Sequence, residues 1–174
     1  NDVVLAGRGG SIHRGSAGSG SWTSTITSLG TPTQNYEHRL FNFDGTDKIV
    51  ITTGTSNPQI LNTSFSTTVV NATGTSNFKF VEIFKNHIFF AGHSSNIQEV
   101  SFMGPNQTND FTSNNGGGTI KVDAEIVGLR AFRDSLIIFG KDKIFKLTGS
   151  SSSDFVITPI TRNIGCTDGR SIQE

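Results

Sequence analysis

Two stretches of the sequence decide the fold, and they carry the same pattern. Residues Phe84–Gly92 read FKNHIFFAG, and residues Phe132–Gly140 read FRDSLIIFG. In both, a strand-forming segment ends at a phenylalanine, two polar residues form a tight turn, and a strongly apolar strand runs to a glycine. Residues Phe43–Gly54, FDGTDKIVITTG, repeat this pattern with a short insertion in the turn. Such recurrence predicts an architecture built from repeats.

A further strand follows each of these glycines after a few residues. These strands are expected at Gln59–Leu61, Gln98–Phe102 and Lys143–Leu147, and a fourth strand can close each unit. The head of the chain, Val3–Gly7 and then Ser11–Ile12, resembles the second half of the unit without its first strand. We therefore expect the chain to begin within a repeat.

The spacing of the glycines gives the size of the unit. Gly7, Gly54, Gly92 and Gly140 are separated in turn by 47, 38 and 48 residues, which matches the length of about 40–50 residues for a propeller blade of four strands. We predict an all-β fold in which antiparallel four-stranded meanders form the blades of a partial β-propeller.

Within this single β domain, about three and a half blades are expected. They should span about 1–35 (a partial blade), 36–76, 77–125 and 126–174. Because this number does not close a ring comfortably, we expect the chain to be a fragment of a longer polypeptide or its ordered part. A β-sandwich is the alternative fold, since its hairpins recur at similar intervals.

The local pattern also predicts which strands are buried. Asn77–Phe80, Thr119–Val122 and Asp154–Ile157 alternate, so that every second side chain points to one face. His87–Ala91 and Ser135–Phe139 are apolar at nearly every position, which predicts burial on both faces. We expect near-complete burial of Phe89, Phe90, Leu136, Ile137, Ile138 and Phe139, and equivalent places in successive blades for Phe43, Phe84 and Phe132.

Composition excludes several classes of protein. The 174 residues carry 14 Lys and Arg against 14 Asp and Glu, so the chain lacks the uniform positive field of a nucleic-acid or anionic-lipid binder. Cys166 is the single cysteine, which excludes an intramolecular disulfide and a cysteine-only zinc cluster. No apolar run approaches the roughly 20 residues that a membrane-spanning helix needs.

The residues that could carry chemistry show no catalytic pattern. The four histidines are His13, His38, His87 and His93; His87 and His93 should lie near opposite ends of one strand, as polar residues close to turns. The glycine-rich segments 7–10, 15–20 and 116–118 lack the Gly-Lys-Ser/Thr ending and the following helix of a phosphate loop. No nucleophile elbow or paired-carboxylate pattern is present. We expect no enzyme activity, no catalytic, metal or cofactor site and no cofactor, and no binding site is assigned.

Glycan binding is the main alternative function for a stand-alone propeller. Sugar platforms use exposed Trp and Tyr side chains, and this chain has one of each, Trp22 and Tyr36. Asn62, Asn71 and Asn106 begin triplets that fit the glycosylation pattern, but a chain rich in Asn, Ser and Thr produces such triplets by chance.

The second half of the chain resembles a known family. Residues 87–149 contain HIFFAG, VSF, NDF, GTI, IVGLRAFRDSLIIF and IFKLTG in this order, and residues 160–171 read ITRNIGCTDGRS. This pattern is similar to that of the β-propeller tail tubular or nozzle proteins of short-tailed bacteriophages. The resemblance covers about residues 84 to 174.

The resemblance implies a structural virion protein of the phage tail. Copies of such a protein form a ring at the distal end of the tail, next to neighbouring tail and adaptor proteins, and DNA leaves through the ring. The family implies neither enzyme activity nor a cofactor. A net charge of zero suits a conduit that does not bind DNA tightly. The alternative is a stand-alone propeller that binds a glycan or a cell-surface receptor.

Overall fold

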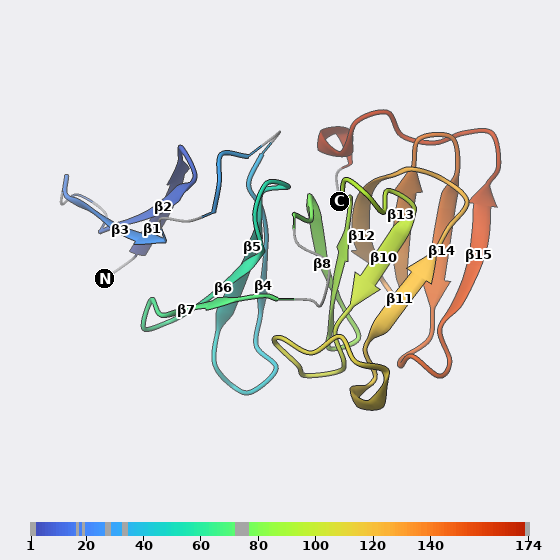
Figure 1. Ribbon diagram of the computed structural model, residues 1–174, viewed down its shortest axis with the longest axis horizontal. Helices are drawn as coiled ribbons and strands as arrows, with labels where there is room; N and C mark the ends of the chain where they lie inside the picture. The colour runs from blue at the N-terminus through green and yellow to red at the C-terminus, as the bar shows by residue number, and fades with distance from the viewer. Residues whose placement is uncertain are drawn as a thin grey trace.

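The computed structural model describes residues 3–16, 18, 20–26, 29–32, 35–71 and 77–172, which form four antiparallel sheets. The sheets follow one another along the chain and lie side by side from left to right in Figure 1. The first sheet contains β1 (Val3–Arg8), β2 (Ser11–Ser16) and β3 (Trp22–Ile26), and the second β4 (Glu37–Phe41), β5 (Lys48–Thr52), β6 (Gln59–Asn62) and β7 (Thr67–Val69). The third contains β8 (Phe80–Phe84), β9 (His87–Ala91), β10 (Glu99–Phe102) and β11 (Gly118–Lys121), and the fourth β12 (Ile126–Phe132), β13 (Ser135–Gly140), β14 (Ile144–Thr148) and β15 (Val156–Thr161).

Each sheet is a meander in which strands pair in chain order, as expected for propeller blades. Two short 3-10 helices are present: η1 (Ser113–Asn115) lies between β10 and β11, and η2 (Gly169–Ser171) follows β15. Of the first strands of the last three sheets, β8 contacts both β4 and β12, and the three form a common inner edge. The prediction of an all-β fold with four-stranded antiparallel blades is confirmed.

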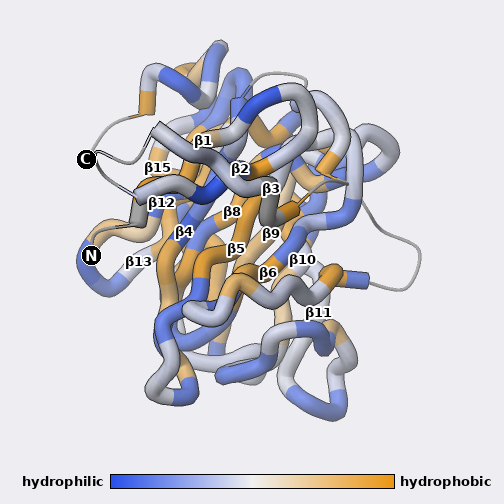
Figure 2. Tube along the Cα trace, turned by 90° about the vertical axis from the view of Figure 1, so that its left-hand side faces the viewer, coloured by the Kyte–Doolittle hydropathy of each residue, from blue (hydrophilic) through white to orange (hydrophobic). Residues whose placement is uncertain are grey.

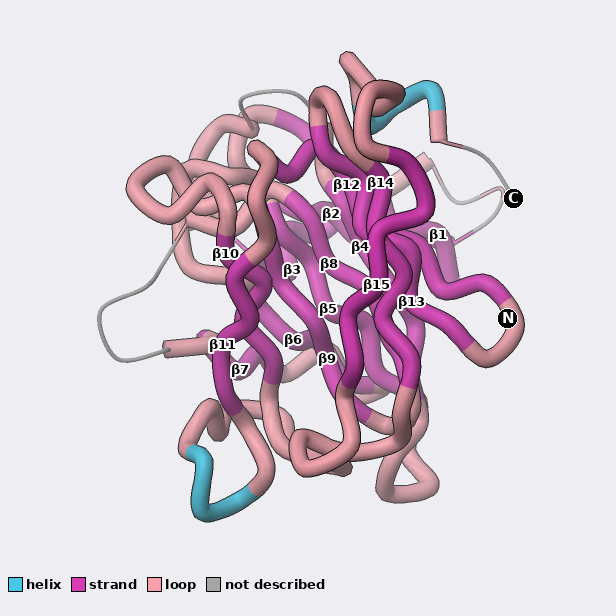
Figure 3. Tube along the Cα trace, turned by 90° about the vertical axis from the view of Figure 1, so that its right-hand side faces the viewer, coloured by secondary structure: helices cyan, strands magenta, loops and turns pink. Residues whose placement is uncertain are grey.

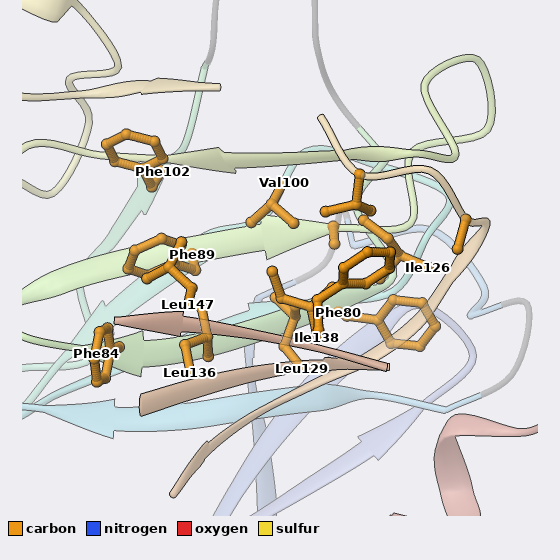
Figure 4. Packing of buried hydrophobic residues seen from close by; sticks show 14 residues of the cluster. Phe80, Phe84, Phe89, Val100, Phe102, Ile126, Leu129, Leu136, Ile138 and Leu147 are labelled. Atoms are coloured by element: carbon orange, nitrogen blue, oxygen red, sulfur yellow. The ribbon is translucent and has the colours of Figure 1, made fainter. Parts of the chain in front are cut away.

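The core lies between successive sheets. Ile12, Ile51 and Leu61 belong to the cluster between the first and second sheets, and Val50 and Phe90 to the one between the second and third. Figure 4 shows the largest cluster, in which Phe80, Phe84, Phe89, Val100 and Phe102 of the third sheet pack on Leu129, Leu136, Ile138 and Leu147 of the fourth. A single blade cannot cover its own two apolar faces, so stacking of blades provides the cover.

The burial of the second strands depends on how many neighbours a sheet has. Every residue of β9 is buried, because the third sheet has a sheet on either side. The prediction that β13 is likewise buried on both faces is wrong in part. Leu136 and Ile138 are buried, but Ile137 and Phe139 are only half-buried. The latter two lie on the face that points away from the third sheet, which is the near face in Figure 3.

Two of the three phenylalanines at the ends of first strands occupy equivalent places. Phe84 pairs with His87 and Phe132 pairs with Ser135, each across a two-residue turn. Phe84 is 4% exposed and Phe132 is 58% exposed, because only Phe84 faces a following sheet. The prediction for Phe43 is wrong, because the insertion lengthens the turn and Phe41 takes the equivalent place opposite Lys48.

Candidate functional site

Three charged side chains meet at the inner edge of the blades. Arg39, Glu82 and Arg130 each lie two residues before the end of a first strand, in β4, β8 and β12. Arg39 Nε donates a hydrogen bond of 2.9 Å to Glu82 Oε1, and Arg130 Nη1 lies 3.5 Å from Glu82 Oε2. We call these three residues the axial charge row.

The row is held in place by the strands that carry it. Glu82 is buried, and its Oε1 also accepts a hydrogen bond of 3.0 Å from the Ile83 backbone N–H. Burial raises the pKa of the Glu82 carboxyl, while the charge and hydrogen bond of Arg39 oppose this shift. Burial likewise raises the pKa of Glu37, which lies 3.7 Å from Arg39 Nη1.

Chemically, this arrangement is a cross-link between three blades. One buried carboxylate lies between two partly exposed guanidinium groups, and Glu37 supplies a second carboxylate close to Arg39. A buried ion pair of this kind gives little net stability, but loss of one partner leaves a buried charge uncompensated. The row therefore links the inner strands of three successive sheets.

The sequence analysis missed this row. The sequence does contain a signal for the row. When the segments EHRLF, FVEIF and GLRAF are aligned on their final phenylalanine, each has a charged residue at the third position. The signal becomes visible only once β4, β8 and β12 are known to be neighbours.

The histidines do not come together into one site. His87 is fully buried beside Phe89, Phe102 and Phe155, with ring centres 5.3 to 6.0 Å away. The expectation that His87 is a polar residue close to a turn is therefore wrong about its surroundings, which are aromatic. His93 accepts a hydrogen bond from the Ser95 N–H, and His13 and His38 lie on β2 and β4. Among the described residues, no group of three or more His, Cys, Asp or Glu side chains could hold a metal ion.

The glycine-rich segments shape the backbone where they are described. Gly9 and Gly10 make the turn between β1 and β2 with φ values of 57° and 83°. The Gly10 N–H donates to the Tyr36 hydroxyl at 2.9 Å. Gly116 caps η1 in the left-handed conformation, whereas residues 17 and 19 lie outside the described residues.

The residues considered for glycan contact are dispersed. Trp22 is 51% exposed on β3, whereas Tyr36 lies against Gly7 and bonds to Gly10. The Asn62 side chain accepts a hydrogen bond from the Ser66 N–H, which closes the turn after β6. Asn106 lies in a turn with a φ of 60°, and the triplet that begins at Asn71 continues into residues outside the described ones.

Comparison with solved structures defines the architecture. A catalytically inactive virginiamycin B lyase from Staphylococcus aureus, solved with quinupristin, matches with a TM-score of 0.56 at 14% identity over 88% of this chain and 49% of that chain. A chain of a nidogen/laminin complex matches with a TM-score of 0.56 at 16% identity, over 84% of this chain and 56% of that chain. BBS1N in complex with ARL6DN matches with a TM-score of 0.55 at 9% identity, over 97% and 55%. The chain has a partial β-propeller fold.

The propeller spans about half the length of these solved chains, and the low identities relate it to them by fold alone. No protein-family model and no curated protein sequence matches it. In the described part of the chain, no helix has the length and apolar character required to cross a membrane.

Proposed function

We propose that the chain is part of a structural virion protein in the tail of a short-tailed bacteriophage, within the tubular or nozzle assembly. Its blades contribute to a ring-shaped conduit through which DNA is ejected. Its partners are other copies of itself and neighbouring tail or adaptor proteins, and DNA passes without tight binding. In this role the chain is not an enzyme and needs no cofactor.

The observation that carries the assembly role is the outer face of the fourth sheet, which we define by Phe132, Ile137, Phe139, Ile144 and Val156. These apolar side chains share the face that points away from the third sheet. Phe132 and Val156 are more than half exposed, and the other three are half-buried. Arg130 and Lys146 lie on either side of Ile137 on this face. A largely apolar sheet face of this kind is typical of a surface that packs against another protein or blade.

The axial charge row is consistent with a passive conduit wall. Arg39 and Arg130 lie at the inner edge, where unpaired cations would attract phosphate groups and add affinity through counterion release. Glu82 contacts both, and Glu37 lies 3.7 Å from Arg39 Nη1, so two carboxylates stand against the two Arg charges before any polyanion approaches. A wall of this kind lets DNA pass without holding it.

The assignment to a phage tail rests on the resemblance of about residues 84–174 to tail nozzle proteins. This segment forms the fourth sheet and β9, β10 and β11 of the third, and therefore includes the outer face and most of the buried cluster. We propose this role for the whole assembly, of which this chain is one part.

Antibody labelling tests the location directly. Antibody fragments raised against the purified chain would be applied to intact particles from the source of the sequence and viewed by negative-stain electron microscopy. We expect labels at the distal end of the tail and none on the capsid. Labels found only in the soluble, particle-free fraction would contradict the proposal, and glycan arrays would then test the receptor-binding alternative.

A further inference from the structure

The connection between β10 and β11, residues 103–117, is the longest between paired strands of the third sheet. We call it the β10–β11 loop; it lies below the β11 label in Figure 2, in the blue and white of polar residues, and Figure 3 shows η1 within it. Asn115–Gly116 in this loop is the single Asn-Gly pair of the chain. Because glycine has no Cβ atom, its backbone nitrogen can approach the preceding side chain closely. An Asn-Gly pair is therefore the sequence at which an asparagine side chain loses its amide group most readily.

The fold requires glycine at position 116. Gly116 caps η1 with a φ of 81°, in the left-handed region that favours glycine. A Cβ atom at this position would also lie 2.9 Å from Pro105 Cδ. The backbone of the β10–β11 loop therefore keeps the small residue that makes Asn115 reactive.

The side chain of Asn115 is held by a carboxylate. Asn115 Nδ2 donates a hydrogen bond of 2.5 Å to Asp110 Oδ2, while Asp110 Oδ1 accepts bonds from the Thr112 hydroxyl at 2.6 Å and the Thr112 N–H at 2.8 Å. These bonds, the one from the Thr112 hydroxyl first, lower the pKa of Asp110 and favour its charged form. An amide at position 115 suits this neighbour, whereas a second carboxylate would be repelled by it.

Both groups that react in a deamidation are engaged in the folded chain. The Gly116 N–H donates to the Ser113 carbonyl oxygen at 3.1 Å, and the amide that would leave is bonded to Asp110. For the Gly116 nitrogen to reach Asn115 Cγ, both hydrogen bonds have to break. The reaction therefore requires local opening of the loop, which costs free energy in the native state.

The β10–β11 loop also connects the third sheet to the second. Asn109 Oδ1 accepts a hydrogen bond of 2.8 Å from the Asn71 N–H, which lies just after β7. Phe111 packs on the core cluster between these two sheets, with its ring centre 5.8 Å from that of Phe90. A change that opens the loop would therefore loosen the junction of two blades.

We propose that Asn115 is a deamidation site of this protein and that Asp110 is the positioning residue that slows its reaction. The Gly116 nitrogen loses its proton and bonds to Asn115 Cγ, and Nδ2 leaves as ammonia. Water then opens the resulting succinimide and gives aspartate or isoaspartate, so that one water is consumed for each ammonia released. The new carboxylate lies against Asp110 and releases the loop. The inference does not depend on the proposed function, because it uses only the geometry of this loop.

Peptide mass spectrometry tests the site. The purified chain is incubated at mildly alkaline pH, either folded or in denaturing urea, and the conversion of each asparagine is followed with time. We expect Asn115 to react first, and at least about tenfold more slowly in the folded chain than in urea. Asn106, exposed in the same loop but followed by Gln107, is the internal control and should react far more slowly than Asn115 in urea. Equal rates for Asn115 in the two states would overturn protection by the fold.

Variants test the role of Asp110. Asp110→Ala should raise the rate at Asn115 in the folded chain by at least about tenfold, and circular dichroism shows whether the variant is folded. Asp110→Asn can still bond to the Asn115 amide, so its rate should stay closer to that of the wild type. Asp154→Ala is the matched control, because Asp154 accepts similar bonds from the N–H groups of Ser150 and Ser151 in another loop. An unchanged rate in Asp110→Ala, or an equal rise in either of the other variants, would overturn the role of Asp110.

Asn115→Asp reproduces the charge of the aspartate product and tests its consequence. Amide hydrogen exchange should become faster at Gly104, whose N–H donates to the Asp110 carbonyl oxygen, and at Asn71. Exchange at Cys166, whose N–H donates to the Gly140 carbonyl oxygen in the fourth sheet, should not change. Unchanged exchange at Gly104 and Asn71 would overturn release of the loop by deamidation.

Discussion

At the scale of single residues, His87 is the most unusual side chain of the core. Its Nδ1 lies 2.6 Å from the Lys85 carbonyl oxygen, and its Nε2 is buried without a hydrogen-bond partner among the described residues. Burial lowers the pKa of His87 below its ordinary value of 6.5, while the bond to Lys85 opposes the shift. Burial in the aromatic cluster therefore favours the neutral form of the ring.

This environment predicts an acid-sensitive fold. Because the pKa of His87 is lower in the folded chain than in the unfolded chain, the unfolded chain binds this proton more readily, and the free energy of unfolding should fall as the pH decreases through about 6.5. Urea unfolding at a series of pH values around this point measures the slope. His87→Phe should flatten the slope, and an unchanged slope in that variant would contradict the assignment.

The centre of the large cluster predicts a second residue-scale effect. Phe89 is fully buried, with ring centres of Phe102 and Phe155 at 5.3 and 5.7 Å. Phe89→Ala should lower the free energy of unfolding by about 3–5 kcal/mol, because it removes apolar contacts and leaves a cavity. Leu40→Ala, at an exposed position, should change it by less than about 0.5 kcal/mol in the same denaturation experiment. Equal effects of the two changes would contradict the described packing.

Some of this burial could be predicted from the sequence. Phe89 and Phe90 lie in a strand that is apolar on both faces, and both are buried. Ile137 and Phe139 lie in a strand with the same composition but are half-exposed. Composition shows that both faces of a strand are apolar, but whether both are buried depends on whether a sheet lies against each of them.

At the scale of strands and turns, the glycines of the repeat have a steric cause. Gly92 follows β9 with a φ of 76°, and a Cβ atom there would lie 2.7 Å from the Phe80 ring. At Gly140, a Cβ atom would lie 2.6 Å from the Ala124 Cβ. The glycine therefore marks a close approach to the preceding strand or loop.

Gly92→Ala should consequently destabilise the fold in two ways, through backbone strain and through a clash. Gly45→Ala is the matched control, since Gly45 has a φ of 78° and no atom would lie within 4 Å of its Cβ. We expect a loss of about 1 kcal/mol for Gly45→Ala and a clearly larger loss for Gly92→Ala. Chemical denaturation of both variants measures the difference, and equal losses would show that the clash is absent.

The axial charge row gives the other prediction at this scale. Glu82→Gln keeps the shape of the side chain but leaves Arg39 and Arg130 without their shared counter-ion. The free energy of unfolding should fall by about 1.5–3 kcal/mol, the range for hydrogen bonds to charged groups. The double variant Arg39→Gln/Glu82→Gln should lose less than the sum of the single variants, and strict additivity would contradict a coupled row.

The repeat could be predicted from the sequence, but the row could not. Tight turns after Phe84 and Phe132 set the strand pairing within each sheet, and local sequence encodes those turns. Which strands of different sheets are neighbours depends on the curvature of the whole stack. The pairing of Arg39 with Glu82, 43 residues apart, follows only from that curvature.

At the scale of the whole molecule, the outer face of the fourth sheet governs association. Phe132→Asp and Val156→Asp each place a charge on this face at a position more than half exposed. Each should change the free energy of unfolding of the monomer by less than about 1 kcal/mol, and each should abolish association of the purified chain at high concentration. Sedimentation velocity measures this, and association of the variants equal to that of the wild type would exclude the face as an interface.

The most direct test of the account is electron cryomicroscopy of intact particles from the source of this sequence. We expect density for these four sheets in a rotationally symmetric ring, with β4, β8 and β12 along the inner edge of the propeller and the outer face of the fourth sheet covered. A chain found only as a free monomer, with that face open to solvent, would contradict the role in a tail conduit.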